Sequence, residues 1–90
     1  MRFKSIDIWE RINSKKITVY RCFQTIPDNK YFVQSQDYYY MNDKTGVISK
    51  EQIDFLQNNF LERIFDVDPK DRIYFDSLED VLDDFNEPLD

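Results

Sequence analysis

The pattern of apolar and polar positions divides the chain into a β-rich first half and a helical second half. Residues 5–12, 17–23 and 31–40 alternate apolar and polar side chains and are rich in β-branched and aromatic residues, which predicts three strands. The segment 27–30 (Pro-Asp-Asn-Lys) supplies turn chemistry, because proline presets φ and both Asp and Asn tolerate tight turns. We therefore expect the second and third strands to form an antiparallel hairpin.

A first amphipathic helix is predicted over about residues 50–65. Ser49 can cap its N-terminus, and Gln52 three residues later completes a capping box with it. The segment 66–69 ends the helix, since its proline cannot continue a helix and disfavours helical backbone in the residue before it. Apolar residues recur at spacings of three and four and form one stripe for burial: Ile53, Leu56, Phe60 and Ile64.

The last quarter of the chain predicts a short fourth strand and a second helix. Residues 72–75 are typical of a strand, and Ser77 with Asp80 repeats the capping pattern at the start of a helix over about 77–86. The buried face of this helix is predicted to hold Leu78, Val81, Leu82 and Phe85. The order β-β-β-α-β-α predicts one α+β domain over residues 1–90, with two helices packed on an antiparallel sheet of three to four strands.

The negative charge of the chain is concentrated at its C-terminal end. The chain has 18 acidic and 12 basic residues, of which residues 66–90 contain ten acids and two bases. This segment therefore has a net charge of −8, and the rest of the chain has +2, which gives the total of −6. A concentrated field of one sign attracts and selects partners, whereas a mixed surface does so weakly. Acids four residues apart on the second helix repel one another, and the helix dipole disfavours Asp83 and Asp84 near its end, at a cost of about 1 kcal/mol.

Two interpretations of the acidic helix are open. In one, its acids form a solvated face that keeps a small protein soluble, with Lys15, Lys16 or Arg21 folding back against it. In the other, they bind a basic protein surface, for example the groove of a nucleic-acid-binding protein, where carboxylates would replace phosphates. The residues expected to bind such a partner are the acids Asp76, Glu79, Asp80, Asp83, Asp84 and Glu87 and the tyrosines Tyr38, Tyr39 and Tyr40.

The composition excludes several kinds of chemistry. The absence of histidine excludes Ser/His and Cys/His catalysis, and the presence of a single glycine, Gly46, excludes a Gly-rich phosphate loop. The acids of residues 66–71 are spaced like those of a calcium loop, but the required glycine is missing and the twelfth position is Ser77. We therefore expect neither a metal nor a cofactor. Cys22, the single cysteine, is expected to be a buried thiol rather than a nucleophile.

The leading expectation for function is a non-catalytic protein–protein interaction module, such as an inhibitor or regulator, that presents an acidic helix to a basic partner. A self-associating structural or adaptor domain, with a homodimer formed through a hairpin edge or an aromatic patch, is the first alternative. A small carboxylate-based enzyme is the second. The net charge argues against direct nucleic-acid binding. We expect a cytoplasmic protein of bacterial or phage-like origin, without a signal peptide or membrane span.

Overall fold

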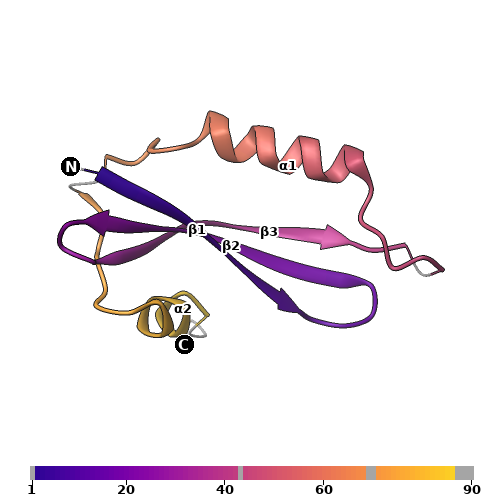
Figure 1. Ribbon diagram of the computed structural model, residues 1–90, viewed down its shortest axis with the longest axis horizontal. Helices are drawn as coiled ribbons and strands as arrows, with labels where there is room; N and C mark the ends of the chain where they lie inside the picture. Colours follow the sequence, from indigo (N-terminus) through magenta and orange to yellow (C-terminus); the bar gives the residue numbers. More distant parts are fainter. Residues whose placement is uncertain (1, 43, 69–70, 87–90) are drawn as a thin grey trace.

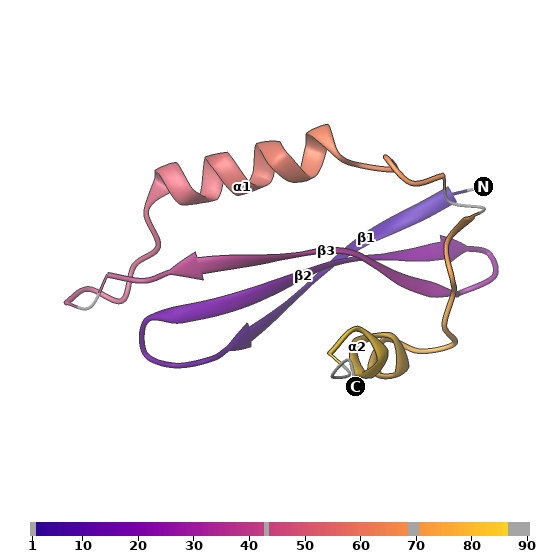
Figure 2. The ribbon, with the colours of Figure 1, turned by 180° about the vertical axis from the view of Figure 1, so that it is seen from behind.

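The fold is an antiparallel sheet with one helix on each face. The structure, a computed structural model, describes residues 2–42, 44–68 and 71–86. The sheet has the strand order β1–β2–β3, and the helices α1 and α2 lie on its opposite faces (Figure 1) and (Figure 2). The predicted α+β architecture is thus confirmed. The elements are β1 (Arg2–Arg11), β2 (Lys16–Ile26), β3 (Tyr31–Tyr40), α1 (Lys50–Glu62) and α2 (Leu78–Asn86).

The central strand β2 carries most of the buried side chains. Every residue from 18 to 23 is buried, because β1 and β3 flank this strand and both helices cover its faces. On the α2 face, Tyr20, Cys22 and Val33 pack against Val81 of the helix. Alternation along β2 therefore sends Tyr20 and Cys22 toward α2, and sends their neighbours Val19 and Arg21 toward α1.

The core on the α1 face is aromatic. Phe23 of β2 and Phe32 of β3 pack against Phe60, the buried residue of α1. The ring centroids of Phe23 and Phe60 are 5.9 Å apart, in a stacked arrangement, and Phe3 of β1 lies edge-on to Phe23 at 6.2 Å. Of the predicted apolar stripe, Phe60 is buried and Leu56 half-buried, whereas Ile53 and Ile64 are exposed.

The predicted fourth strand is reduced to a single bridge. Of residues 72–75, only Phe75 pairs with the sheet, through two backbone hydrogen bonds of 2.9 Å with Tyr31. The first helix also ends earlier than predicted, at Glu62, where Arg63 forms the C-cap and Phe65 adopts a positive φ of 59°. The chain bends at residues 76–77, directly before α2, so the pairing does not continue past Phe75.

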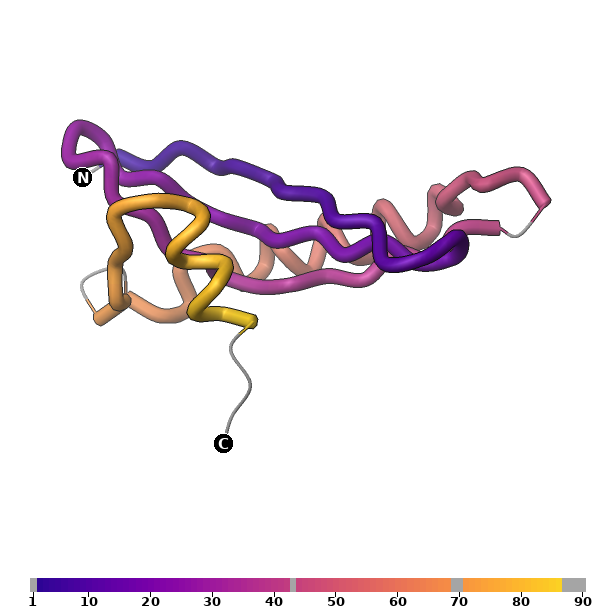
Figure 3. The backbone as a smooth tube through the Cα atoms, turned by 90° about the horizontal axis from the view of Figure 1, so that it is seen from below, coloured from indigo at the N-terminus to yellow at the C-terminus, as the bar shows by residue number. Residues whose placement is uncertain are grey.

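The molecule is elongated, with extents of 44 × 30 × 24 Å. Seen from below, α2 covers the half of the sheet nearer the β2–β3 turn, and the end with the β1–β2 turn extends beyond it (Figure 3). Helix α2 therefore covers only part of its face of the sheet. This leaves sheet surface uncovered on the α2 face.

Candidate protein-binding surface

Helix α2 is fixed in one orientation by its cap and its buried stripe. The Ser77 side-chain oxygen accepts a hydrogen bond from the backbone N–H of Asp80 at 3.1 Å, as the capping pattern predicts. Val81 is buried against the sheet, and Leu78 and Leu82 pack beside it. Because these residues take up the inner side of the helix, its acids are directed outward. We call Asp76, Glu79, Asp80, Asp83 and Asp84 the acidic surface; all five are exposed.

The charges of the acidic surface are largely uncompensated. Asp76 forms an ion pair with Lys30, and both side chains are exposed. Within the described residues, the other four acids form no ion pair with a lysine or arginine. The sixth predicted acid, Glu87, lies outside the described residues. Four carboxylates on one short helix are therefore left with solvent as their partner.

An apolar hollow lies beside the acidic surface. It has a volume of about 330 Å³ and is lined by side chains of β3, of α2 and of the chain that leads into α2. Asp84 stands at its border with Phe85, and Val67 and Ile73 contribute from the preceding segment. Ile73 is 79 % exposed, the highest fraction among the exposed large apolar side chains of the described residues, so its apolar surface is available to a partner. Acidic and apolar groups are thus combined in one place.

Arg72 is the basic residue of this hollow. Its guanidinium carbon lies 5.1 Å from the centroid of the Phe32 ring, and its Nε atom is buried without a hydrogen-bond partner among the described residues. Asp71 and Asp84 also line the hollow. The charged residues that line the hollow are therefore two aspartates and one arginine, and the arginine lies over an aromatic ring.

The three predicted tyrosines are divided between the two faces of the sheet. Tyr38 and Tyr40 are 42 % and 56 % exposed and lie on the face that α2 packs against. The Tyr38 ring is covered by Lys16, whose Nζ atom is 4.0 Å from the ring centroid. Tyr39 is 2 % exposed and faces α1, so its side chain is not available to a partner. Two of the three tyrosines can therefore serve as contacts.

The position of Tyr38 relative to α2 follows from the strand register. Asn86, at the C-terminal end of the helix, accepts a hydrogen bond of 3.2 Å from the Tyr20 hydroxyl. Tyr20 pairs with Gln36, and Tyr38 lies two residues further along β3. The register therefore places Tyr38 and Tyr40 on β3 beyond the residues that lie beside the C-terminal end of α2.

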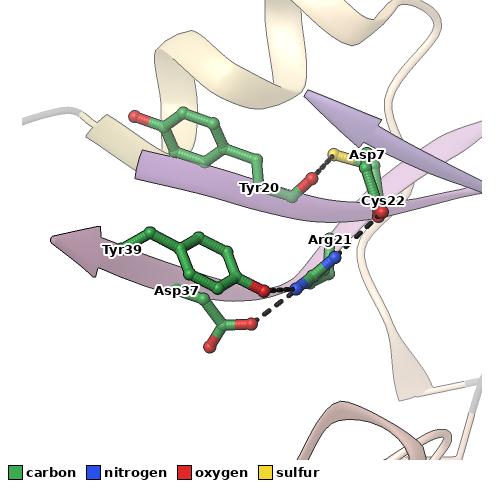
Figure 4. Close-up of polar contacts among 6 residues, drawn as sticks. All are labelled: Asp7, Tyr20, Arg21, Cys22, Asp37 and Tyr39. Carbon is green, nitrogen blue, oxygen red and sulfur yellow. Dashed lines mark hydrogen bonds and ion pairs between the residues drawn. The ribbon is translucent and has the colours of Figure 1, made fainter. Parts of the chain in front are cut away.

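On the opposite face, a buried arginine links all three strands (Figure 4). Arg21 of β2 is 2 % exposed and donates to Asp7 of β1 at 2.9 Å and to Asp37 of β3 at 3.0 Å. It also donates to the Tyr39 hydroxyl at 2.8 Å. Burial alone would lower the pKa of Arg21, but the hydrogen bond to Asp37 and the charge of Asp7 raise it above its ordinary value. The guanidinium is therefore charged and internally neutralised.

This network corrects the expectation that Arg21 folds back against the acidic helix. Arg21 shares a face of β2 with Val19 and Phe23, the face that packs under α1, and so points away from α2. The sequence contains a signal for this burial, because Arg21 alternates in step with the apolar residues Val19 and Phe23 of the same strand. The residues of β3 that bind Arg21 could not be predicted from the sequence, because the pairing of β2 with β3 shifts register between Arg21 and Cys22.

The cluster also has a bearing on the carboxylate-enzyme alternative. Asp7, Asp37 and the Tyr39 hydroxyl converge, but the Arg21 guanidinium lies among them and takes up one oxygen of each. Cys22 is buried as predicted, and burial raises the pKa of its thiol to about 11, so the reactive thiolate is disfavoured. The polar groups around Arg21 are therefore used in contacts within the protein.

No prosthetic group or relative indicates the function. In the described part of the chain, no three carboxylate or thiol side chains are grouped so that they could hold a metal ion. Neither described helix has the length and apolar character needed to cross a bilayer. Comparisons with protein-family models, curated protein sequences and solved structures give no match. The geometry of α2 and its hollow is therefore the basis of the functional argument.

Proposed function

We propose that the chain is a non-catalytic protein–protein interaction module that presents the acidic surface of α2 to a basic partner and occludes it. One observation carries this proposal: four outward carboxylates of α2 have no ion-pair partner among the described residues. Their field would speed encounter with a basic surface, and packed apolar contacts would then set the lifetime of the complex.

The apolar hollow supports a binding surface over a merely solvated one. Solubility requires charge, but it does not require Ile73 and Phe85 to be exposed beside Asp84. Interfaces combine apolar anchors with a charged rim, which is the arrangement at this edge of α2. A partner with an apolar side chain surrounded by lysines or arginines would fit both parts.

A nucleic-acid-binding protein is the partner class that we favour. Side chains one helical turn apart are about 6 Å apart, similar in scale to phosphates along a strand. On α2, Asp80 and Asp84 have this spacing, as do Glu79 and Asp83. Such a row of carboxylates could occupy a groove that otherwise binds the phosphate backbone.

The test is affinity capture from the native cell with matched charge variants. The test variant replaces Asp80, Asp83 and Asp84 with Asn. The control removes three exposed acids from α1 on the opposite face, as Glu51→Gln, Asp54→Asn and Glu62→Gln, so that both variants change the net charge equally. We expect the wild-type chain and the control to retain a basic protein at low salt, and the α2 variant to lose it.

Competition identifies the class of partner. An excess of duplex DNA should release a captured nucleic-acid-binding protein if the acidic surface occupies its nucleic-acid groove. Equal capture by both triple variants would contradict the proposal, because a partner attracted by net charge alone cannot distinguish α1 from α2.

A further inference from the structure

The two outer edges of the sheet differ in how far other parts of the chain contact them. The outer edge of β3 has such contacts at both of its ends. At one end, Tyr31 exchanges two backbone hydrogen bonds with Phe75. At the other end, the Gln52 side chain accepts from the Tyr40 N–H and donates to the Tyr40 carbonyl, both at 2.8 Å. The Ser49 hydroxyl accepts from the Gln52 N–H, as the predicted cap requires, and the Gln52 side chain donates to that hydroxyl at 3.1 Å while it also acts as a strand partner for the last residue of β3.

The middle of the β3 edge is covered as well. The Gln34 side chain donates to the Arg63 carbonyl at 3.2 Å and accepts from the Phe65 N–H at 3.3 Å. These contacts bring the end of α1 and the following turn against the strand. Together with the hydrogen bonds of Phe75 and Gln52, these contacts leave a second strand only part of the β3 edge to pair with.

The outer edge of β1 has no such cover in the part of the chain that the structure describes. The ten residues of β1 pair with β2 and with no other strand or bridge. Ile12 N–H donates to the Lys16 carbonyl, which places the backbone groups of even-numbered residues toward β2. Alternation therefore turns outward the N–H and C=O groups of Phe3, Ser5, Asp7, Trp9 and Arg11.

We propose that β1 pairs antiparallel with β1 of a second copy of this chain, across a two-fold axis at Ile6. The two three-stranded sheets would then form one continuous sheet. In this register Arg2 lies opposite Glu10 of the second copy, and the pair occurs twice. Ser5 lies opposite Asp7, and Phe3 lies opposite Trp9 on the α1 face.

Charge complementarity selects this register from its neighbours. An axis at Asp7 would also form two opposite-charge pairs, Lys4 with Glu10, but it would place Asp7 directly opposite its own copy, and like charges directly opposite destabilise a sheet. An axis at Ser5 or at Ile8 would bring no opposite charges into cross-strand pairs. The axis at Ile6 forms two opposite-charge pairs without a directly facing like-charge pair. It also places Lys4 diagonal to Glu10 of the second copy, so that an edge lysine becomes compatible with pairing.

Two copies of a protein with a net negative charge repel each other, but this repulsion is weak where β1 lies. The strand carries Arg2, Lys4 and Arg11 against Asp7 and Glu10, so it is slightly basic in a protein with a net charge of −6. The acids that would repel a second copy are concentrated on α2, which packs against β3 and β2. The pairing does not depend on the proposed function, because it uses neither α2 nor its hollow.

The test is a charge exchange read by sedimentation equilibrium from about 1 µM to about 1 mM. The wild-type chain should approach twice its mass of 11.0 kDa as concentration rises. Glu10→Arg should weaken the dimer by about tenfold or more, since it converts both cross-strand pairs to repulsion. Arg2→Glu combined with Glu10→Arg should restore it. Glu51→Arg on α1 changes the net charge equally and should have no effect.

Amide hydrogen exchange gives a second readout that locates the contact. The outward amides of Phe3, Ser5, Asp7 and Trp9 should exchange quickly in dilute samples and become protected as concentration rises. The even-numbered amides of β1 already bond to β2 and should change little. A chain that stays monomeric to 1 mM, or a dimer that Glu10→Arg leaves intact, would overturn the proposal.

Discussion

The two faces of the sheet use carboxylates in opposite ways. On the α1 face, Asp7 and Asp37 lie within 3.0 Å of the buried Arg21 guanidinium, and their charges are part of the fold. On the α2 face the interior is apolar, and the acids of the helix point outward and form no ion pair with another described residue, whereas Asp76, just before the helix, pairs with Lys30. Acids paired with a buried arginine are part of the fold, whereas exposed acids without an ion-pair partner are available to another molecule.

Removal of the base on the α1 face should have the largest effect. We expect Arg21→Met, which keeps an apolar stem under Phe60, to lower the free energy of unfolding by about 3 kcal/mol, because two carboxylates lose their partner. Urea denaturation measures the change. The matched control is Lys30→Met, which removes the exposed ion pair with Asp76 and should cost less than about 1 kcal/mol. Equal losses would show that the Arg21 network has no special structural weight.

The protein should lose stability at high pH because of Cys22, which is buried on the α2 face. Burial raises the pKa of this thiol from 9.0 to about 11, so the folded protein keeps it neutral where the unfolded chain ionises it. The associated stability is fully present below pH 9 and is lost as the pH rises through 11, by about 2–3 kcal/mol. The stability gap between wild type and Cys22→Ala should therefore shrink over this window. A constant gap would mean that the thiol is hydrated in the folded state.

The Tyr39 hydroxyl should contribute less than Arg21. In Tyr39→Phe, Arg21 loses a hydrogen bond of 2.8 Å, while the stacking of Trp9 on the ring at 5.4 Å is retained. We expect a loss of about 1.5 kcal/mol, the lower end for a bond to a charged group. Thermal or urea unfolding would measure it. Tyr38→Phe, on an exposed neighbour, should change stability by less than about 0.5 kcal/mol, and a similar loss in both variants would contradict the division between the two tyrosines.

The local elements of this fold could be predicted from the sequence, whereas its long-range contacts could not. The third strand has the predicted bounds of 31–40, and Ser49 and Ser77 both act as helix caps, because these features depend on neighbours along the chain. The Arg21 network depends on a register shift between β2 and β3, and no local pattern encodes which residue of β3 faces Arg21.

The candidate site was predictable to a similar extent. Helix periodicity placed the acids of α2 on its outer side, and alternation placed Tyr38 and Tyr39 on different faces. The apolar hollow beside Asp84 was not predictable, because it forms where α2, β3 and the segment containing Ile73 meet. The acids of α2 lie beside an apolar hollow because of how these elements pack, and this packing exists only in the folded chain.

The most direct measurement of the central claim is the association rate of the captured partner with three forms of the chain at several ionic strengths. The forms are the wild type, the α2 triple variant (Asp80→Asn, Asp83→Asn, Asp84→Asn) and the α1 triple variant (Glu51→Gln, Asp54→Asn, Glu62→Gln). We expect the α2 variant alone to associate about tenfold more slowly and with a weaker salt dependence, at unchanged or higher stability. If the two variants associate at the same rate, the acids of α2 are a solvated face and the account is contradicted.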